Sequence, residues 1–277
     1  MTFDAKITSR RHPLVQRLRA AARRDGDEVL LDGPHLLAEA LRSQAATGAG
    51  RSTLLAVVVT HRVIDTPELE ALCDEAARQG VPVQIVPDAL ADAISPAVSP
   101  TGVVSLAEVS LASLDATLAH DRPLLVVLAG VQDPGNVGTI VRTAEAAGAS
   151  GVLLLEGTAD PLGWKAVRGS MGSALRVPLH RSSNGAATLD ELRARGVKVV
   201  AADSRMSRTG PDVPDLTGPA ALLVGAEGRG LPDALLAAAD VVVRVPVAPP
   251  VESLNVAVAT ALLLFEVRRR RGGPGVL

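Results

Sequence analysis

The 277-residue sequence has few aromatic side chains: Phe3, Trp164 and Phe265 are the whole set, and tyrosine is absent. Proteins that bind single-stranded nucleic acid without sequence preference stack successive bases on aromatic rings. The sequence therefore excludes a nucleic-acid surface built from a row of aromatic rings. No tyrosine or well-placed histidine is available for hydride chemistry, which disfavours a nucleotide-dependent oxidoreductase.

Cysteine is nearly absent too, since Cys73 is the only one. A disulfide within one chain is impossible, which fits a reducing cytoplasm. Cys73 lies at helical spacing from Leu69, Leu72 and Ala76, so it is predicted to be a small buried hydrophobe rather than a nucleophile or a metal ligand.

Long apolar runs are missing, because Asp133, Arg244 and Glu266 interrupt the best candidates. A transmembrane helix needs about 20 apolar residues, so none is predicted. The N-terminal sequence has charges but no apolar core after them, and no signal peptide is expected. The predicted location is the cytoplasm.

An excess of positive charge is also lacking, since the net charge is -2 and the pI is near 6.2. Evidence for nucleic-acid binding must therefore come from local patches. There are two, and each could be an RNA contact or a solvated helix face or tail. They comprise Lys6, Arg10, Arg11, Arg17, Arg19, Arg23 and Arg24 near one end and Arg268 to Arg271 near the other.

No histidine pair or acidic cluster has the spacing of metal ligands, and the five histidines are scattered. We therefore expect no metal. The nucleotide-cofactor fingerprint G-x-G-x-x-G is also missing.

Hydrophobic periodicity predicts two α/β domains, at 1–108 and 122–277, joined by a linker at 109–121. In the second, continuous Val and Leu runs alternate with helices, which predicts a mostly parallel sheet. Ligand sites of such sheets lie outside the carboxyl ends of the strands. The predicted strands there are 123–130, 151–157, 175–180, 197–204, 221–228 and 241–247, and the predicted helices are 136–148, 164–173, 186–195, 232–238 and 253–270.

Three loops after predicted strands could carry chemistry. In the loop at 131–148, glycines permit close backbone approach, Asn136 can cap the helix, and Arg142 projects from its second turn. The loop is either a cradle for an anion, with Arg142 gripping a phosphate, or an ordinary strand-to-helix turn. In the loop at 225–232, three glycines surround one carboxylate, Glu227.

The third loop opens the stretch VPVAPPVESLNVAVATALLLFE at 245–266. Ser253 is predicted to be the helix N-cap. Asn255 would then lie inside the first turn, where asparagine has poor propensity and no capping duty. A polar residue that breaks the local rule at such a position indicates function. We expect the three loops to meet at one crevice.

These loops carry a family resemblance. The motifs N-x-G-x-x-x-R-T-A (Asn136–Ala144), G-x-E-G-x-G-L (Gly225–Leu231) and P-x-x-x-x-x-x-S-L-N-V (Pro246–Val256) resemble motifs one, two and three of the SpoU (TrmH) RNA 2'-O-ribose methyltransferases of the SPOUT superfamily. The segment WKAVRGSMGSAL at 164–175 is similar to that family's internal helix. Residues 7–24 and 29–41 resemble, more weakly, its preceding substrate-binding domain, with Asp32-Gly33 where relatives usually have Glu-Gly.

The resemblance implies a fold that spacing alone could not show. It implies an N-terminal ribosomal-protein-like α/β substrate-binding domain and a C-terminal SPOUT domain with a parallel sheet and a deep trefoil knot. It also implies a homodimer whose active site takes residues from both subunits. S-adenosylmethionine would bind in and directly before the second and third motifs, at Val224, Gly225, Ala226, Val245, Pro246 and Leu254.

The same resemblance makes Arg142 the central catalytic residue, helped by Asn136, Glu227, Ser253 and Asn255. A guanidinium with a pKa above about 12 is a poor base. We therefore expect Arg142 to bind the phosphate beside the target ribose and to stabilise alkoxide charge, with Glu227 or phosphate taking the proton.

The expected substrate is RNA, with 23S ribosomal RNA favoured and transfer RNA the alternative. A non-catalytic RNA-binding protein of the same fold is a further alternative. The residues predicted to contact RNA are Arg10, Arg11, Arg17, Lys165 and Arg168. The last two lie on one face of a helix that could also be simply solvated.

Overall fold

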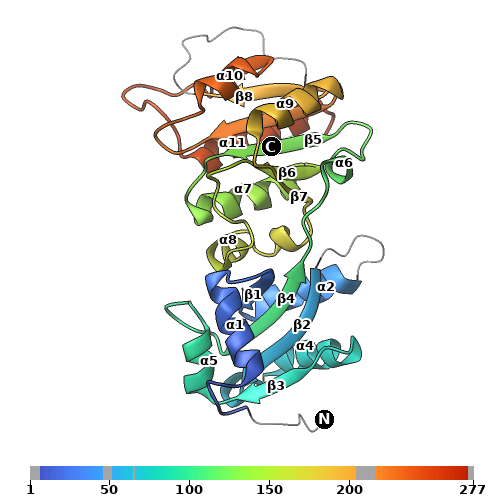
Figure 1. The fold of residues 1–277 in the computed structure, drawn as a ribbon, viewed down its shortest axis with the longest axis vertical. Coiled ribbons are helices and arrows are strands. Elements are labelled where there is room, and N and C mark those ends of the chain that lie inside the picture. The colour runs from blue at the N-terminus through green and yellow to red at the C-terminus, as the bar shows by residue number, and fades with distance from the viewer. Residues whose placement is uncertain (1–6, 46–51, 65, 204–215, 274–277) are drawn as a thin grey trace. The chain divides into compact units, whose positions relative to one another are not determined.

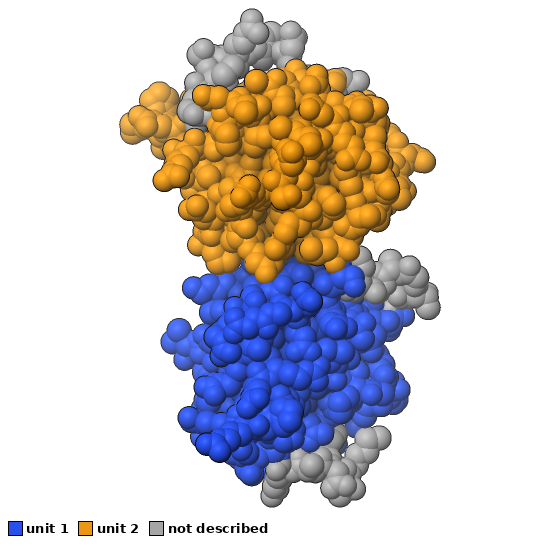
Figure 2. Space-filling model, in the orientation of Figure 1, with its two compact units in different colours: residues 1–110, 162–176 blue, residues 111–161, 177–277 orange. Residues whose placement is uncertain are grey.

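A computed structural model describes residues 7–45, 52–64, 66–203 and 216–273 of the chain. The chain forms two compact units (Figure 2). Unit 1 consists of residues 1–110 together with 162–176, and unit 2 of residues 111–161 together with 177–277. The segment 162–176 thus leaves the sequence of unit 2 and joins unit 1.

Unit 1 is built on a four-stranded mixed sheet in the order β1-β4-β2-β3. β4 runs antiparallel to β1 and β2, whereas β2 and β3 are parallel. The strands are β1 (Glu28–Asp32), β2 (Ser52–Thr60), β3 (Val83–Val86) and β4 (Val103–Val109).

Helices cover both faces of this sheet (Figure 1). α1 (Pro13–Arg23) and α5 (Asp88–Ile94) pack on one face, and α2 (Pro34–Ala45) and α4 (Pro67–Arg78) lie on the other. The unit also contains α3 (His61–Ile64), α8 (Trp164–Gly169) and a 3-10 turn, η1 (Ser173–Leu175). Cys73 in α4 is fully buried, as predicted, and burial raises the pKa of its thiol to about 11.

Unit 2 contains the predicted parallel sheet, with six strands in the order β10-β8-β9-β5-β6-β7, all parallel. The two central strands, β5 and β9, are buried along their whole length, because helices cover both faces. The strands are β5 (Leu124–Ala129), β6 (Gly151–Leu154), β7 (Leu179–Arg181), β8 (Lys198–Ala202), β9 (Ala220–Gly225) and β10 (Val241–Val243). β7 begins four residues later than predicted, because η1 and Pro178 precede it.

On one face of the sheet, side chains of α6 (Leu114–Thr117), α9 (Gly185–Ala194) and α10 (Asp233–Ala237) join the apolar core. α7 (Pro134–Ala147) and α11 (Val256–Arg270) pack against each other on the other face (Figure 1). Among the described residues, no helix is long and apolar enough to cross a membrane.

The starts of α7 and α11 differ from the prediction. α7 is capped by Asp133, whose Oδ1 accepts a hydrogen bond from the backbone N–H of Asn136 at 2.8 Å, so the predicted cap at Asn136 is wrong. Pro134 takes the first helical position, where its missing N–H costs nothing. Because the helix starts earlier, Arg142 lies in its third turn rather than its second.

α11 begins at Val256, and its N-cap is Asn255, so the predicted cap at Ser253 is also wrong. Asn255 has extended backbone angles, and its Oδ1 accepts hydrogen bonds from the N–H groups of Ala257 at 2.9 Å and Val258 at 3.3 Å. The sequence predicted no capping role for Asn255, but the structure shows that it caps α11.

The basic C-terminal patch is held within unit 2 and is not a frayed tail. Glu266 pairs with Arg269 and Arg270, which lower the pKa of its carboxyl to about 2. Arg268 donates to the carbonyl of Ala146. The guanidinium of Arg271 is partly buried and donates to four backbone carbonyls, those of Arg122, Pro123, Leu216 and Gly218.

Candidate active site

A cavity of about 460 Å³ opens at the carboxyl ends of β8, β9 and β10, all in unit 2. Parallel sheets place ligand sites at this edge because the loops after neighbouring strands converge there. The volume lies within the roughly 300–1,000 Å³ of small-molecule sites. Its walls are formed by Ala202, Asp203, Val224, Gly225, Ala226, Glu227, Gly228, Gly230, Val243, Val245, Val247, Glu252, Ser253, Leu254, Asn255, Val256 and Ala259.

The glycine-rich loop after β9 folds back tightly on its own strand. Gly230 donates its N–H to the carbonyl of Ala226 at 2.9 Å. A Cβ at Gly225 would stand 2.5 Å from the carbonyl carbon of Gly230, closer than real Cβ atoms come. Gly225 is therefore required by backbone packing, and this turn exposes main-chain groups to the cavity with little side-chain bulk.

A chain of side-chain hydrogen bonds joins the three loops that the sequence singled out. Asn136 Nδ2 donates to Glu227 Oε1 at 2.7 Å, and Asn255 Nδ2 donates to Asn136 Oδ1 at 3.0 Å. The backbone N–H of Gln132 donates to the other carboxylate oxygen of Glu227 at 3.3 Å. The three loops therefore meet, as predicted, but of the three only the second and third line the cavity.

The donor and acceptor directions in this series of hydrogen bonds are fixed at both ends. An ionised carboxylate only accepts, so Asn136 must turn its NH₂ toward Glu227 and its oxygen toward Asn255. At the other end, the Oδ1 of Asn255 faces two helix N–H groups, which turns its NH₂ toward Asn136. The hydrogen bonds thus fix the orientation of each amide and form a brace between α7, the glycine-rich loop and α11.

Most of the residues predicted for the donor site lie in the cavity wall, namely Val224, Gly225, Ala226, Val245 and Leu254. Pro246 is exposed and is not among the lining residues. Ser253, Glu227 and Asn255 line the cavity, whereas Asn136 reaches it through its two partners.

Arg142 is exposed on α7 and does not line this cavity. It follows Asn136 by six residues, which places it about 9 Å farther along the helix and about 120° around it. The structure thus separates Arg142 from the brace within one chain.

The residues predicted to contact RNA lie in unit 1. Arg10 and Arg11 are exposed just before α1, and Lys165 and Arg168 are exposed on α8. Arg17 forms an ion pair with Glu28, with 2.5 Å between Nη2 and Oε1.

Sequence reasoning missed Asp203, a cavity-lining residue directly after β8 that is only 5% exposed. Its place at the end of a predicted strand was a usable signal. Among the described residues, no group of three or more His, Cys, Asp or Glu side chains could hold a metal ion.

Comparison with known proteins shows similarity along nearly the whole chain. Residues 123–265 match the model of the SpoU rRNA methylase family, and residues 30–110 match that of the RNA 2'-O ribose methyltransferase substrate-binding domain. An uncharacterized tRNA/rRNA methyltransferase of Synechocystis is 32% identical, over 98% of this chain and 96% of its own.

Two further relatives have more specific names. The 23S rRNA (guanosine(2553)-2'-O)-methyltransferase RlmP of Bacillus subtilis is 33% identical, over 86% of this chain and 88% of its own. The crystal structure of an AdoMet-bound rRNA methyltransferase from Sinorhizobium meliloti superposes with a TM-score of 0.76 at 30% identity, covering 96% of this chain and 97% of that one.

The chain is thus a two-unit α/β protein with a cavity at the carboxyl edge of a parallel sheet. The chain belongs to the SpoU family of RNA methyltransferases. The resemblance seen in the three sequence motifs is confirmed.

Proposed function

We propose that this protein transfers a methyl group from S-adenosylmethionine to a ribose 2'-hydroxyl of RNA, in 23S ribosomal RNA. The observation that carries the proposal is the brace of Glu227, Asn136 and Asn255 beside the cavity. It joins residues from all three motifs at one edge of the sheet. A non-catalytic RNA-binding protein would have no need for such a fixed polar constellation.

The cavity suits the methyl donor. Its volume is that of a small-molecule site, and its walls combine apolar side chains with the bare backbone at Gly225. Val224, Val243, Val245 and Leu254 would enclose the apolar parts, and the exposed Glu227, Glu252 and Ser253 would face the polar tail. When bound, the donor supplies a sulfonium methyl group.

In the reaction, a bond forms between the ribose 2'-oxygen and the methyl carbon, the carbon–sulfur bond breaks, and the hydroxyl proton leaves. Alignment of the reacting atoms is potentially the largest contribution, roughly 7–11 kcal/mol. The brace serves this alignment, because it fixes the side chain of Asn255 at the mouth of α11.

Arg142 binds the phosphate beside the target ribose and stabilises the developing negative charge on the 2'-oxygen. A guanidinium holds its proton, so Arg142 is not the base. Glu227 holds Asn136 in place, and its carboxylate or a substrate phosphate accepts the proton. Loss of Arg142 should lower turnover far more than donor affinity.

The protein acts as a homodimer, and Arg142 of one subunit completes the cavity of the other. The separation of Arg142 from the cavity within one chain supports this arrangement. An apolar strip beside the cavity, formed by Val251, Leu254, Val258 and Leu262, is 37–52% exposed and would be buried by a second copy. The C-terminal chain forms the trefoil knot of the family.

For the domain roles we keep the boundaries that the sequence predicts, although the structure groups residues 162–176 with unit 1 and residues 111–121 with unit 2. Residues 1–108 bind the RNA substrate, 109–121 link the domains, and 122–277 carry the chemistry. The match of residues 30–110 to a substrate-binding model supports the first assignment. The B. subtilis relative named for 23S rRNA favours ribosomal over transfer RNA. The cytoplasm is the proposed location.

The test offers purified 23S and transfer RNA separately, with tritiated donor, to the wild type and to Arg142→Ala. Label in 23S RNA that is lost in the variant, with donor binding unchanged, supports the proposal. Donor binding without label in either RNA would favour the non-catalytic alternative.

Subunit complementation tests the shared site. Mixed Arg142→Ala and Asn136→Ala subunits should regain activity, since heterodimers hold one site with both residues intact. A mixture as inactive as its components would place both residues in the same subunit's site.

A further inference from the structure

A strained turn follows α8 in unit 1. Met171 has a φ of 52° and Gly172 a φ of 87°, so two successive residues adopt the left-handed conformation. The first position after a helix end often has this conformation, and glycine usually occupies it because a Cβ makes it unfavourable. Here the position holds methionine. The left-handed backbone conformation alone would favour glycine at this position, so the presence of methionine points to a role for the Met171 side chain.

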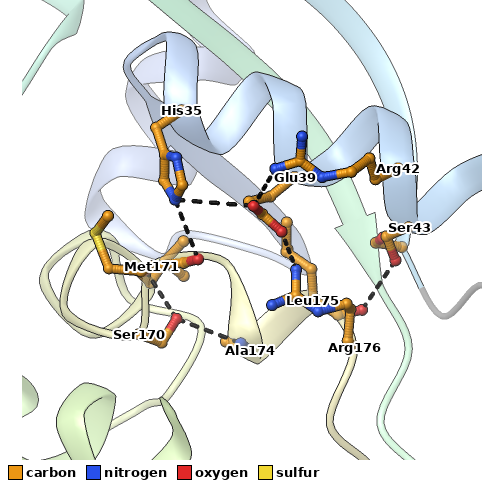
Figure 3. Close-up of polar contacts among 11 residues, drawn as sticks. His35, Glu39, Arg42, Ser43, Ser170, Met171, Ala174, Leu175 and Arg176 are labelled. Carbon is orange, nitrogen blue, oxygen red and sulfur yellow. Dashed lines mark hydrogen bonds and ion pairs between the residues drawn. The ribbon is translucent and has the colours of Figure 1, made fainter. Parts of the chain in front are cut away.

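The turn is fixed to α2 by several polar contacts (Figure 3). His35 Nε2 lies 3.4 Å from the carbonyl oxygen of Met171, and Ser43 Oγ donates to the carbonyl of Leu175 at 3.3 Å. Glu39 accepts from Arg176, which follows the turn. A Cβ at Gly172 would stand 2.5 Å from Cγ of Glu39, so the turn lies directly on this side chain.

These contacts hold the backbone of the turn and leave the Met171 side chain outside. That residue is 40% exposed, and its side chain points away from the Glu39 cluster (Figure 3). An exposed apolar side chain on a rigid, strained support is arranged to contact something other than the core of its own unit.

The charged groups around the turn are mainly positive on the outside. The Glu39 side chain is only 12% exposed and is engaged by Arg42 and Arg176. The Arg42 side chain is 63% exposed. Lys165 and Arg168 are also exposed, on the helix that leads into the turn, and Lys165 Nζ lies 5.5 Å from the ring centroid of Trp164. Phosphate groups are the partners that such a surface favours.

We propose that Met171 is an apolar contact for an unpaired base of the RNA substrate, and that Arg42, Lys165 and Arg168 bind the phosphates beside it. The methionine thioether is polarizable and makes favourable contacts with aromatic rings. RNA-binding proteins usually stack an aromatic side chain on an unpaired base. In this protein, which has hardly any aromatic side chains, the methionine thioether would pack against the base instead. This inference rests on the proposed function, because it assigns part of the surface that recognises the RNA.

The discriminating variant is Met171→Gly, which relieves the left-handed strain while removing the side chain. We expect an unchanged or higher unfolding temperature, unchanged binding of S-adenosylhomocysteine, and a KM for RNA raised about twofold to tenfold. A purely structural role for Met171 predicts no rise in KM. The matched control is Val98→Ala, which trims a fully exposed apolar side chain elsewhere in unit 1 and should leave KM unchanged.

If Met171→Gly lowers the unfolding temperature, Met171→Asn replaces it, because asparagine tolerates the left-handed conformation and removes the apolar contact. Arg168→Gln should weaken RNA binding and reduce the slope of log affinity against log salt by about one. An unchanged KM in the Met171 variant, measured while the wild type methylates RNA, overturns this inference. Absence of methylation by the wild type would instead refute the proposed function.

Discussion

Asn255 has two separable duties in this structure, and substitution can divide them. Its Oδ1 caps α11, and its Nδ2 donates to Asn136 at 3.0 Å. Removing an asparagine cap costs about 1 kcal/mol, and the side-chain hydrogen bond adds about 1 kcal/mol. Asn255→Ala should therefore lower stability by about 2 kcal/mol, or about 4–8 °C in Tm for a unit of this size.

Asn255→Asp keeps the cap, because aspartate is an equally good N-cap and its charge suits the helix N-terminus. It cannot donate to Asn136, however, so two oxygens would face each other and the brace would break. We expect a Tm within about 4 °C of the wild type and methyl transfer reduced roughly tenfold to a hundredfold by misalignment.

Thermal unfolding and methyl transfer are measured side by side on both variants, with Ser253→Ala as the control for capping. That control should leave Tm nearly unchanged, because Asn255 rather than Ser253 is the cap. Full activity of Asn255→Asp would refute the role of the brace, and a Tm lowered as much by Ser253→Ala as by Asn255→Ala would refute the capping role of Asn255.

Three further predictions concern stability and reactivity. Arg271→Ala should lower the free energy of unfolding, measured in urea, by about 2–4 kcal/mol, because four backbone carbonyls lose a charged donor. Arg269→Ala, at an exposed position, should lower it by at most about 1 kcal/mol. Equal losses in the two variants would contradict this prediction. The pKa of Glu266 is lowered to about 2, so its pairing stabilises above about pH 4.5 and is lost as the pH falls toward 2; Glu266→Gln should therefore lose its destabilising effect over that range, and a constant difference would refute it. Cys73, with its pKa raised to about 11 by burial, should react with a thiol reagent at pH 8 only as fast as the protein unfolds.

The sequence predicted the parallel sheet and the convergence of the three loops because both depend on local patterns. Continuous Val and Leu runs mark strands buried on both faces, and glycines next to a single carboxylate mark a functional turn. The partner of each polar side chain was beyond reach. Nothing in the spacing shows that Asn136 meets Glu227, 91 residues away.

The helix starts were predicted wrongly for a physical reason. Ser253 and Asn255 are both good capping residues, and the choice between them depends on where the extended chain at the cavity wall ends. Tertiary contacts decide that end. The return of 162–176 to unit 1 was likewise invisible, because its polar contacts with α2 join residues 132 to 137 positions apart.

The position of the transferred methyl group distinguishes ribose methylation from base methylation. RNA labelled by the wild-type protein is digested to nucleosides, and the product is identified by mass spectrometry. The proposed function predicts one 2'-O-methylnucleoside, absent when Arg142→Ala replaces the wild type. A methyl group on a base would contradict it, because the proposed roles of Arg142 and of the brace both serve a ribose 2'-oxygen.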